Sequence, residues 1–187
     1  MRFLIIPEDS RNDRYILEPL VHGLLEQAGY RRPKCRICND PHLGGVSEAL
    51  KSARLREVFD RYAGMVDVFL LCVDRDAERG RQRRLDDLEE EFSGERFTFI
   101  ATQAWEEVET WALAGAALPG EWAWADVRRA RDVKEDFFEP YVEIMGLQND
   151  PGGGRRFLGR QAATNLQRVR QLCPEFDAFG TRLSEIL

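Results

Sequence analysis

Hydrophobic positions along the first hundred residues follow two alternating patterns. Strand-length apolar runs occur four times, at residues 3–6, 34–38, 66–73 and 97–101. Helical spacing or helix start and stop signals lie between them, over residues 14–28, 47–63 and 79–92. The run at 66–73 is almost wholly apolar, as expected for a central strand covered on both faces. Strands that alternate with helices of this length predict a parallel sheet with helices on both sides.

The pattern changes after residue 105 and becomes helical. Helices are predicted at residues 106–115, from Asp126 onward, and over 134–146, 155–172 and 175–187. The glycine-rich segment 149–154 is expected to be a flexible connector. We therefore predict an α/β, Rossmann-like core over residues 1–115. A helical C-terminal extension over 116–187 is expected to pack on that core.

Composition fits this picture of a folded chain. Hydrophobic residues make up 43% of the 187 positions, which is enough to bury a core. No apolar run reaches the roughly 18 residues that a membrane span needs. The apolar stretch at the N-terminus is too short for a signal peptide. These features predict a cytoplasmic protein without membrane association.

The formal net charge of −6 would not draw the whole chain to a polyanion. Arginines nevertheless gather in three groups, 79–84, 128–131 and 155–160. A local basic face is compatible with a nucleic acid substrate, and it is equally typical of solvated helix faces.

Two of the four cysteines form a Cys-x-x-Cys pair, Cys35 and Cys38, followed by His42. The spacing allows a zinc site, but no second pair of ligands follows, and a structural zinc site needs four. We therefore favour a strand edge that carries two thiols. Cys72 lies in an apolar run and is expected to be a reduced core residue.

Acidic residues follow the predicted strands at the edge where parallel sheets bind ligands. Glu8 comes after the first strand, and Asp74 and Asp76 leave the third. Alternate residues of an extended segment point the same way, so the Asp-x-Asp pair is expected to face one ion. Carboxylates without His or Cys partners suit Mg²⁺ or Mn²⁺. The competing interpretation is that these residues cap helices or offset helix dipoles.

The same residues resemble the Toprim domain of topoisomerases, primases and the overcoming-lysogenization-defect nucleases. A small, stand-alone bacterial Toprim-like family of unknown function is more similar still. The resemblance spans most of the chain and rests on four segments: 7–10 (Pro-Glu-Asp-Ser), 73–76 (Val-Asp-Arg-Asp), 107–114 (Glu-Val-Glu-Thr-Trp-Ala-Leu-Ala) and 174–179 (Pro-Glu-Phe-Asp-Ala-Phe).

The resemblance implies Mg²⁺-dependent (or Mn²⁺-dependent) hydrolysis of phosphodiester bonds, a nuclease activity in genome defence or DNA repair. Glu8 would serve as general acid/base or metal ligand, and Asp74 and Asp76 would hold the metal. A second ion would need another acidic residue soon after Glu8. Asp9 and Asp13 are the nearest candidates, but neither has the expected spacing from Glu8. The position with that spacing is occupied by Asn12.

Further residues are predicted to complete this site. Of the helical carboxylates, Glu109 is favoured over Glu107 as a metal ligand, because Val108 and Trp111 should face the core. Substrate phosphates are expected to contact three arginines near the metal: Arg11, Arg75 and Arg79. Ordinary ion pairing of these arginines with neighbouring carboxylates is an equal alternative.

The expected partner is nucleic acid, with DNA favoured over RNA. The resemblance also implies an ATPase partner, because related Toprim nucleases are often fused to one or encoded beside one. The chain has no phosphate-binding loop for ATP, so any ATP-driven step would need that partner. Other functions remain open. A non-catalytic metal- or nucleic-acid-binding module of a two-component ATPase system is one. A phosphatase or phosphotransferase would place its Asp-x-Asp after the first strand, and a sugar-nucleotide transferase is usually a longer chain.

Overall fold

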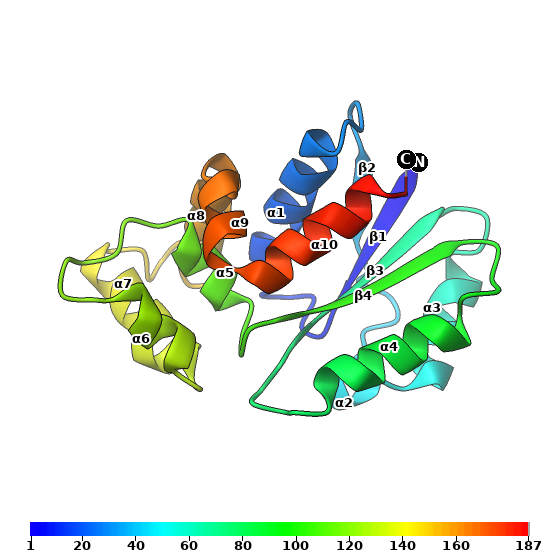
Figure 1. Cartoon of the computed structure of the whole chain (residues 1–187), viewed down its shortest axis with the longest axis horizontal. Coiled ribbons are helices and arrows are strands. Elements are labelled where there is room, and N and C mark those ends of the chain that lie inside the picture. The colour runs from blue at the N-terminus through cyan, green and yellow to red at the C-terminus, as the bar shows by residue number, and fades with distance from the viewer. Residues whose placement is uncertain (187) are drawn as a thin grey trace.

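A four-stranded, all-parallel sheet forms the centre of the computed structural model, which describes residues 1–186 (Figure 1). Its strands are β1 (Arg2–Pro7), β2 (Lys34–Ile37), β3 (Val68–Asp74) and β4 (Thr98–Ala104). They are ordered β2-β1-β3-β4, and every neighbouring pair is parallel. The predicted α/β fold with a parallel sheet flanked by helices is confirmed.

Both faces of the sheet are buried, which explains the continuous apolar runs of β1 and β3. Alternate residues such as Ile5 and Leu70 join one hydrophobic cluster, and Leu4 and Phe69 join the other. One face carries α1 (Arg14–Gln27) and the C-terminal helices (Figure 1). The other face carries α2 (Val46–Ala49), α3 (Ser52–Arg61) and α4 (Arg81–Glu91).

The second helical segment of the core differs from its prediction. A single helix is expected over residues 47–63, but α2 (Val46–Ala49) and α3 (Ser52–Arg61) are separate. The chain is extended at Lys51, and the carbonyl of Leu50 accepts hydrogen bonds from Arg84. Arg84 belongs to α4 (Arg81–Glu91), so a long-range contact replaces the bond that would have continued the helix.

The C-terminal half is helical, as predicted, but more finely divided. Its elements are α5 (Glu109–Ala114), α6 (Trp124–Arg129), the π-helix η1 (Lys134–Phe138), α7 (Glu139–Ile144), α8 (Arg155–Thr164), α9 (Leu166–Leu172) and α10 (Pro174–Ser184). The expected helix over 155–172 is interrupted at Asn165, whose side chain donates to the carbonyl of Gly115 (2.8 Å). The expected helix end at Leu187 lies outside the described residues. Over residues 1–186, no helix is long and apolar enough to cross a membrane.

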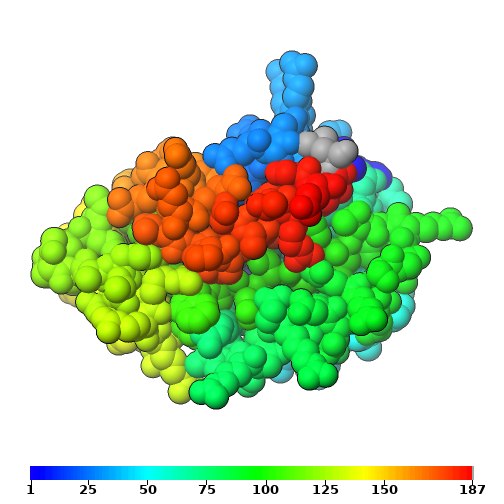
Figure 2. Space-filling model, viewed as in Figure 1, coloured from blue at the N-terminus to red at the C-terminus, as the bar shows by residue number. Residues whose placement is uncertain are grey.

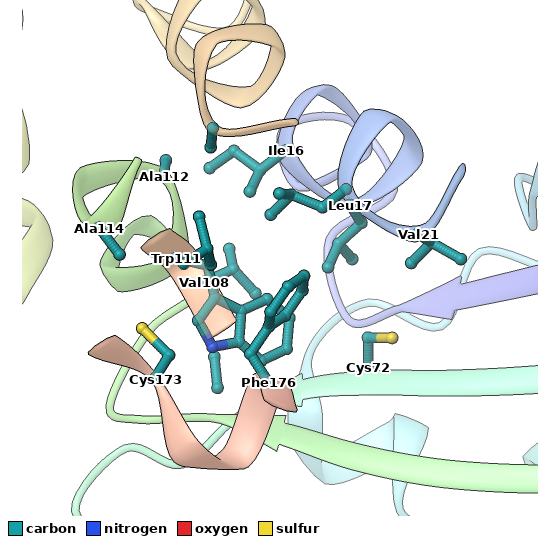
Figure 3. Close-up of a cluster of buried hydrophobic side chains, with 14 of the residues drawn as sticks. Ile16, Leu17, Val21, Cys72, Val108, Trp111, Ala112, Ala114, Cys173 and Phe176 are labelled. Carbon is teal, nitrogen blue, oxygen red and sulfur yellow. The ribbon is translucent and has the colours of Figure 1, made fainter. Parts of the chain in front are cut away.

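A tryptophan joins these helices to the core (Figure 3). Trp111 of α5 is fully buried and packs on Phe176 of α10, with ring centroids 5.0 Å apart. Its indole nitrogen donates to Glu175 (3.0 Å), which also accepts two hydrogen bonds from Arg128. The C-terminal segment therefore shares one core with the sheet and lies beside the N-terminal segment (Figure 2).

The glycine-rich segment before α8 is a close-packed turn and not the flexible connector that its composition predicted. Gly152, Gly153 and Gly154 all have positive φ values, of 71°, 58° and 84°. A Cβ atom on Gly152 would meet the Tyr15 ring at 2.5 Å, and one on Gly154 would meet Val142 at 2.5 Å.

Helices α1 and α8 approach each other closely at Gly159, which gives a first prediction. A Cβ atom there would lie 2.2 Å from the carbonyl oxygen of Tyr15, a backbone atom that cannot move alone. We expect Gly159→Ala to lower the free energy of unfolding by about 2 kcal/mol, as other overpacked contacts do. Urea denaturation measures this, with Gly94→Ala as the control because nothing lies within 4 Å of its Cβ position. Equal stability of the two variants would contradict the close contact.

Candidate functional site: a carboxylate cluster at the sheet edge

Glu8 and Asp74 lie together at the carboxyl edge of the sheet. Strands β1 and β3 are neighbours in register, with Pro7 opposite Cys72, so the two chains end side by side. Glu8 follows β1 and Asp74 ends β3, and the Glu8 carboxylate accepts a hydrogen bond from the backbone amide of Asp74 (3.3 Å). The strand order reverses between β1 and β3, and such a switch point is where open parallel sheets bind ligands.

Two more carboxylates reach this point from helix starts. Asp13 directly precedes α1 and is only 7% exposed, and its side chain accepts the amide of Asp9 (3.0 Å). Glu109 begins α5 and is only 4% exposed. We call Glu8, Asp13, Asp74 and Glu109 the carboxylate cluster.

The members of the cluster lie close enough to act on one another electrostatically. Burial is the main cause that raises the pKa of Asp74 well above its usual value, and the charges of Glu8, Glu109 and Asp13 add to it. Burial, with Glu109 and Glu8, also raises the pKa of Asp13 to about 8. The pKa of Glu8 is raised by burial and by Asp76 and Glu109, against the hydrogen bond from Asp74. The site thus concentrates negative charge that the fold itself only partly balances.

Spacing along the sequence disfavours Asp13, but the structure places it inside the cluster. One signal in the sequence points to this position: Asp13 directly precedes a helix whose apolar residues begin at Ile16 and Leu17, which places its start near the core. Glu109 is in the cluster as predicted, and Val108 and Trp111 are buried as expected. Glu107 points elsewhere and accepts the backbone amide of Lys134 (2.6 Å).

Asp76 departs from the expected geometry. The extended chain that was to align it with Asp74 ends at Asp74, and Asp76 and Ala77 have positive φ values of 52° and 54°. The Asp76 side chain is 46% exposed and pairs with Arg81 at 3.4 Å. Asp76 therefore lies at the rim of the cluster, near enough to raise the pKa of Glu8 but not parallel to Asp74.

A buried glutamate that the sequence did not single out holds this turn. Glu106, itself at φ 59°, accepts through its carbonyl the amides of Arg75 (2.9 Å) and Asp76 (3.1 Å). Its carboxylate pairs with the Arg75 guanidinium and accepts the amide of Ala77. Three non-glycine residues in the left-handed region mark backbone strain, which tends to persist at functional sites.

Comparisons with family models, with curated proteins and with solved structures found no match. The fold and the geometry of the cluster are therefore what bears on function.

Of the predicted phosphate contacts, Arg75 is engaged elsewhere. Besides its pair with Glu106, its guanidinium stacks 4.0 Å from the centroid of the Trp105 ring. The alternative of ordinary ion pairing is the one that the structure supports for Arg75. Arg11 and Arg79 are exposed, and within residues 1–186 neither side chain has an ion-pair partner.

Two other arginines reach the cluster. Arg155 of α8 pairs with Glu109, donating from Nε at 2.8 Å and from a second nitrogen. Arg81 of α4 is buried, and its Nε has no hydrogen-bond partner within the described part of the chain. An unpartnered buried guanidinium nitrogen is costly, so Arg81 is a better candidate than Arg75 for contact with an anion at this site.

The donor chemistry of the cluster suits a hard divalent cation, but the carboxylates do not form a closed cage. Among residues 1–186, no three His, Cys, Asp or Glu side chains are arranged to hold one ion together. Asp74 accepts the amide of Val108 (2.8 Å), and Glu109 is occupied by Arg155. Mg²⁺ fits such a site nonetheless, because it commonly keeps several waters and takes one or two carboxylates plus substrate phosphate oxygens.

The cysteine pair does not form part of any such site. Cys35 packs against one hydrophobic cluster, and Cys38 belongs to the cluster on the other face of the sheet. The Nδ1 atom of His42 lies 3.1 Å from the hydroxyl oxygen of Ser10. The interpretation of residues 34–38 as a strand edge with two thiols therefore holds.

Proposed function

We propose that this chain is a divalent-cation-dependent phosphodiester hydrolase, a nuclease, whose centre is the carboxylate cluster. The observation that carries the proposal is the meeting of Glu8 and Asp74 at the switch point of the sheet, with Asp13 and Glu109 beside them. Four acidic groups from four separate elements converge where a parallel sheet binds ligands. Burial and neighbouring charges disfavour the charged forms of Glu8, Asp13 and Asp74. A cation would relieve that repulsion.

Asp74 and Glu8 are the residues that would hold Mg²⁺ or Mn²⁺, with Asp76 at the rim. A cation bound there would neutralise a phosphate and lower the pKa of a bound water. The chain's own residues would contribute the rest. Burial raises the pKa of Glu8, which favours its protonated form and suits a group that takes up and returns a proton. Arg81 would contact a phosphate oxygen from the start of α4, which is favourable for an anion.

The test is digestion of plasmid DNA and of labelled RNA, with Mg²⁺, with Mn²⁺ and with EDTA, in parallel with Glu8→Gln. We expect cleavage that needs the cation and falls about 100-fold in Glu8→Gln, because that variant loses a proton-transfer group. Asp87→Asn, an exposed change on α4, is the control. DNA is the expected substrate over RNA, and an ATPase partner is the expected addition if the isolated chain cleaves slowly.

Equal cleavage by wild type and Glu8→Gln would point to a contaminating nuclease and overturn the assignment. A non-catalytic binding module is the second candidate, and one observation favours it: the carboxylates do not form a ready cage within residues 1–186. Cation binding without cleavage of any substrate, with or without an ATPase, would favour that module.

A further inference from the structure

A groove runs between α1 and α8 on the side of the molecule that carries the C-terminal helices. A cavity of about 570 Å³ lies between the two helices and is lined from α1 by Arg14, Tyr15 and Pro19, and from α8 by Arg156 and Arg160. A second hollow of about 330 Å³ adjoins it and shares Arg156 and Arg160, with Phe157 added. We call the two together the α1–α8 groove.

The end of the groove that holds Arg14 and Arg156 is the end nearer to the carboxylate cluster. Asp13 of the cluster directly precedes Arg14 on α1, and Arg155, which pairs with Glu109 of the cluster, directly precedes Arg156 on α8. Both helices start at this end, so their positive dipole ends lie there too, although several of their first amides already have partners, as that of Phe157 has in Asp150 (3.0 Å). A strand that leaves the groove at this end would be at its nearest to the proposed reaction centre.

The charges at this end of the groove favour an anion. Arg14 and Arg160 form no ion pair within residues 1–186, whereas Arg156 is held by Asp150 at 2.9 Å. The acidic residues of the groove are Asp150, Glu18 and Glu26, and Glu26 lies at its far end, where it faces His22. Arg14 begins α1, and Arg160 lies in the second turn of α8. Unpartnered guanidinium groups such as these two are suited to phosphate oxygens.

Aromatic side chains alternate with these arginines. Phe157 is 44% exposed although it is large and apolar, and it stands between Arg156 and the next helical turn that carries Arg160. Tyr15 lines the floor, with the Arg14 guanidinium 5.8 Å from its ring centroid. Phe157 is thus an exposed ring between two arginines, and Tyr15 is partly buried. Arginines beside an exposed ring can bind the backbone and stack a base of single-stranded nucleic acid.

We propose that the α1–α8 groove binds single-stranded nucleic acid and leads it to the carboxylate cluster. The groove has the size of a ligand pocket, which admits a few nucleotides of one strand and not a duplex. Arg14 and Arg160 contact phosphates, and Phe157 stacks on a base. The path of the strand toward the cluster rests on the proposed function, whereas binding in the groove can be measured separately from cleavage.

Binding is measured by fluorescence anisotropy of a labelled single strand of about 12 nucleotides, within the site sizes of known single-strand binders, as DNA and as RNA, in EDTA so that no cleavage occurs. Arg160→Glu is expected to weaken binding about tenfold and to reduce its dependence on salt. Phe157→Ser is expected to weaken it about fivefold with the salt dependence unchanged. Arg96→Glu is the matched control, since it makes the same charge change at the opposite edge of the sheet, and less than a twofold change is expected there.

Each outcome of these measurements either supports or contradicts the proposed binding site. Three results would each overturn the proposed binding of single-stranded nucleic acid in the groove. They are absence of single-strand binding at low salt, equal effects of Arg160→Glu and Arg96→Glu, and a duplex that competes as well as the single strand. If the groove binds a single strand but no cation-dependent cleavage occurs, the binding site is supported and the proposed hydrolase activity is contradicted. If cleavage occurs but the groove variants do not change binding, the hydrolase activity is supported and the binding site in the groove is contradicted.

Discussion

Asp74→Asn is expected to abolish cleavage and, at the same time, to make the cation-free protein more stable. Asp74 lies at the centre of the carboxylate cluster, and burial together with three neighbouring carboxylates raises its pKa. The amide of Asn has nearly the same shape, and its oxygen can still accept the amide of Val108. The substitution therefore removes the repulsion and the cation ligand but keeps the hydrogen bond.

We expect cleavage to fall by about 100-fold or more, as when other preorganised electrostatic contacts to a transition state are removed. The free energy of unfolding in EDTA at pH 8 should rise, because the substitution removes a buried carboxyl whose charged form burial and its neighbours disfavour. Urea denaturation and the cleavage assay measure the two effects, with Asp87→Asn on the surface of α4 as control. A variant that is both inactive and less stable than wild type would mean that Asp74 is a structural residue.

Stability without a cation is expected to fall as the pH rises from 5 to 8.5, which is opposite to the usual behaviour of paired carboxylates. The pKa of Asp13 is about 8 in the folded chain and about 3.9 in an unfolded one. Between these values the folded state holds a proton that the unfolded state has lost, so raising the pH favours unfolding. Glu107, whose pKa is raised to about 7 mainly by burial, acts in the same direction.

The raised pKa of Asp13 alone corresponds to a loss of up to about 5 kcal/mol between pH 4 and pH 8. Asp13→Asn carries no charge and should flatten the pH dependence by a large part of that amount. Unfolding by urea at pH 5, 6, 7 and 8.5 in EDTA gives the comparison. Parallel curves for wild type and Asp13→Asn would show that Asp13 is not buried among other carboxylates.

The sheet could be predicted from the sequence because its strands are buried on both faces and therefore stand out as apolar runs. Local signals failed where a distant residue decides the backbone. The helix break at Lys51 depends on Arg84, and the break at Asn165 depends on the carbonyl of Gly115. The glycine-rich turn is rigid because Tyr15 and Val142 pack against it, which composition cannot reveal.

The site was predicted in part for the same reason. The alternation of strands and helices predicts a parallel sheet, so Glu8 and Asp74 could be placed at its carboxyl edge. That β1 and β3 are neighbours, which brings the two residues together, is seen only in the structure. Asp13 requires knowledge of how α1 enters the core, and Asp76 turns away because Glu106 holds the chain in a left-handed turn. Such turns are set by tertiary hydrogen bonds, so sequence spacing alone could not place Asp76.

The central claim is that the carboxylate cluster binds a hard divalent cation, and titration calorimetry with Mn²⁺ tests it most directly. We expect saturable binding to the wild-type chain at pH 8, at least tenfold weaker binding to Asp74→Asn, and unchanged binding to Asp87→Asn. Failure of the wild type to bind Mn²⁺, or equal binding by the wild type and Asp74→Asn, would contradict the account.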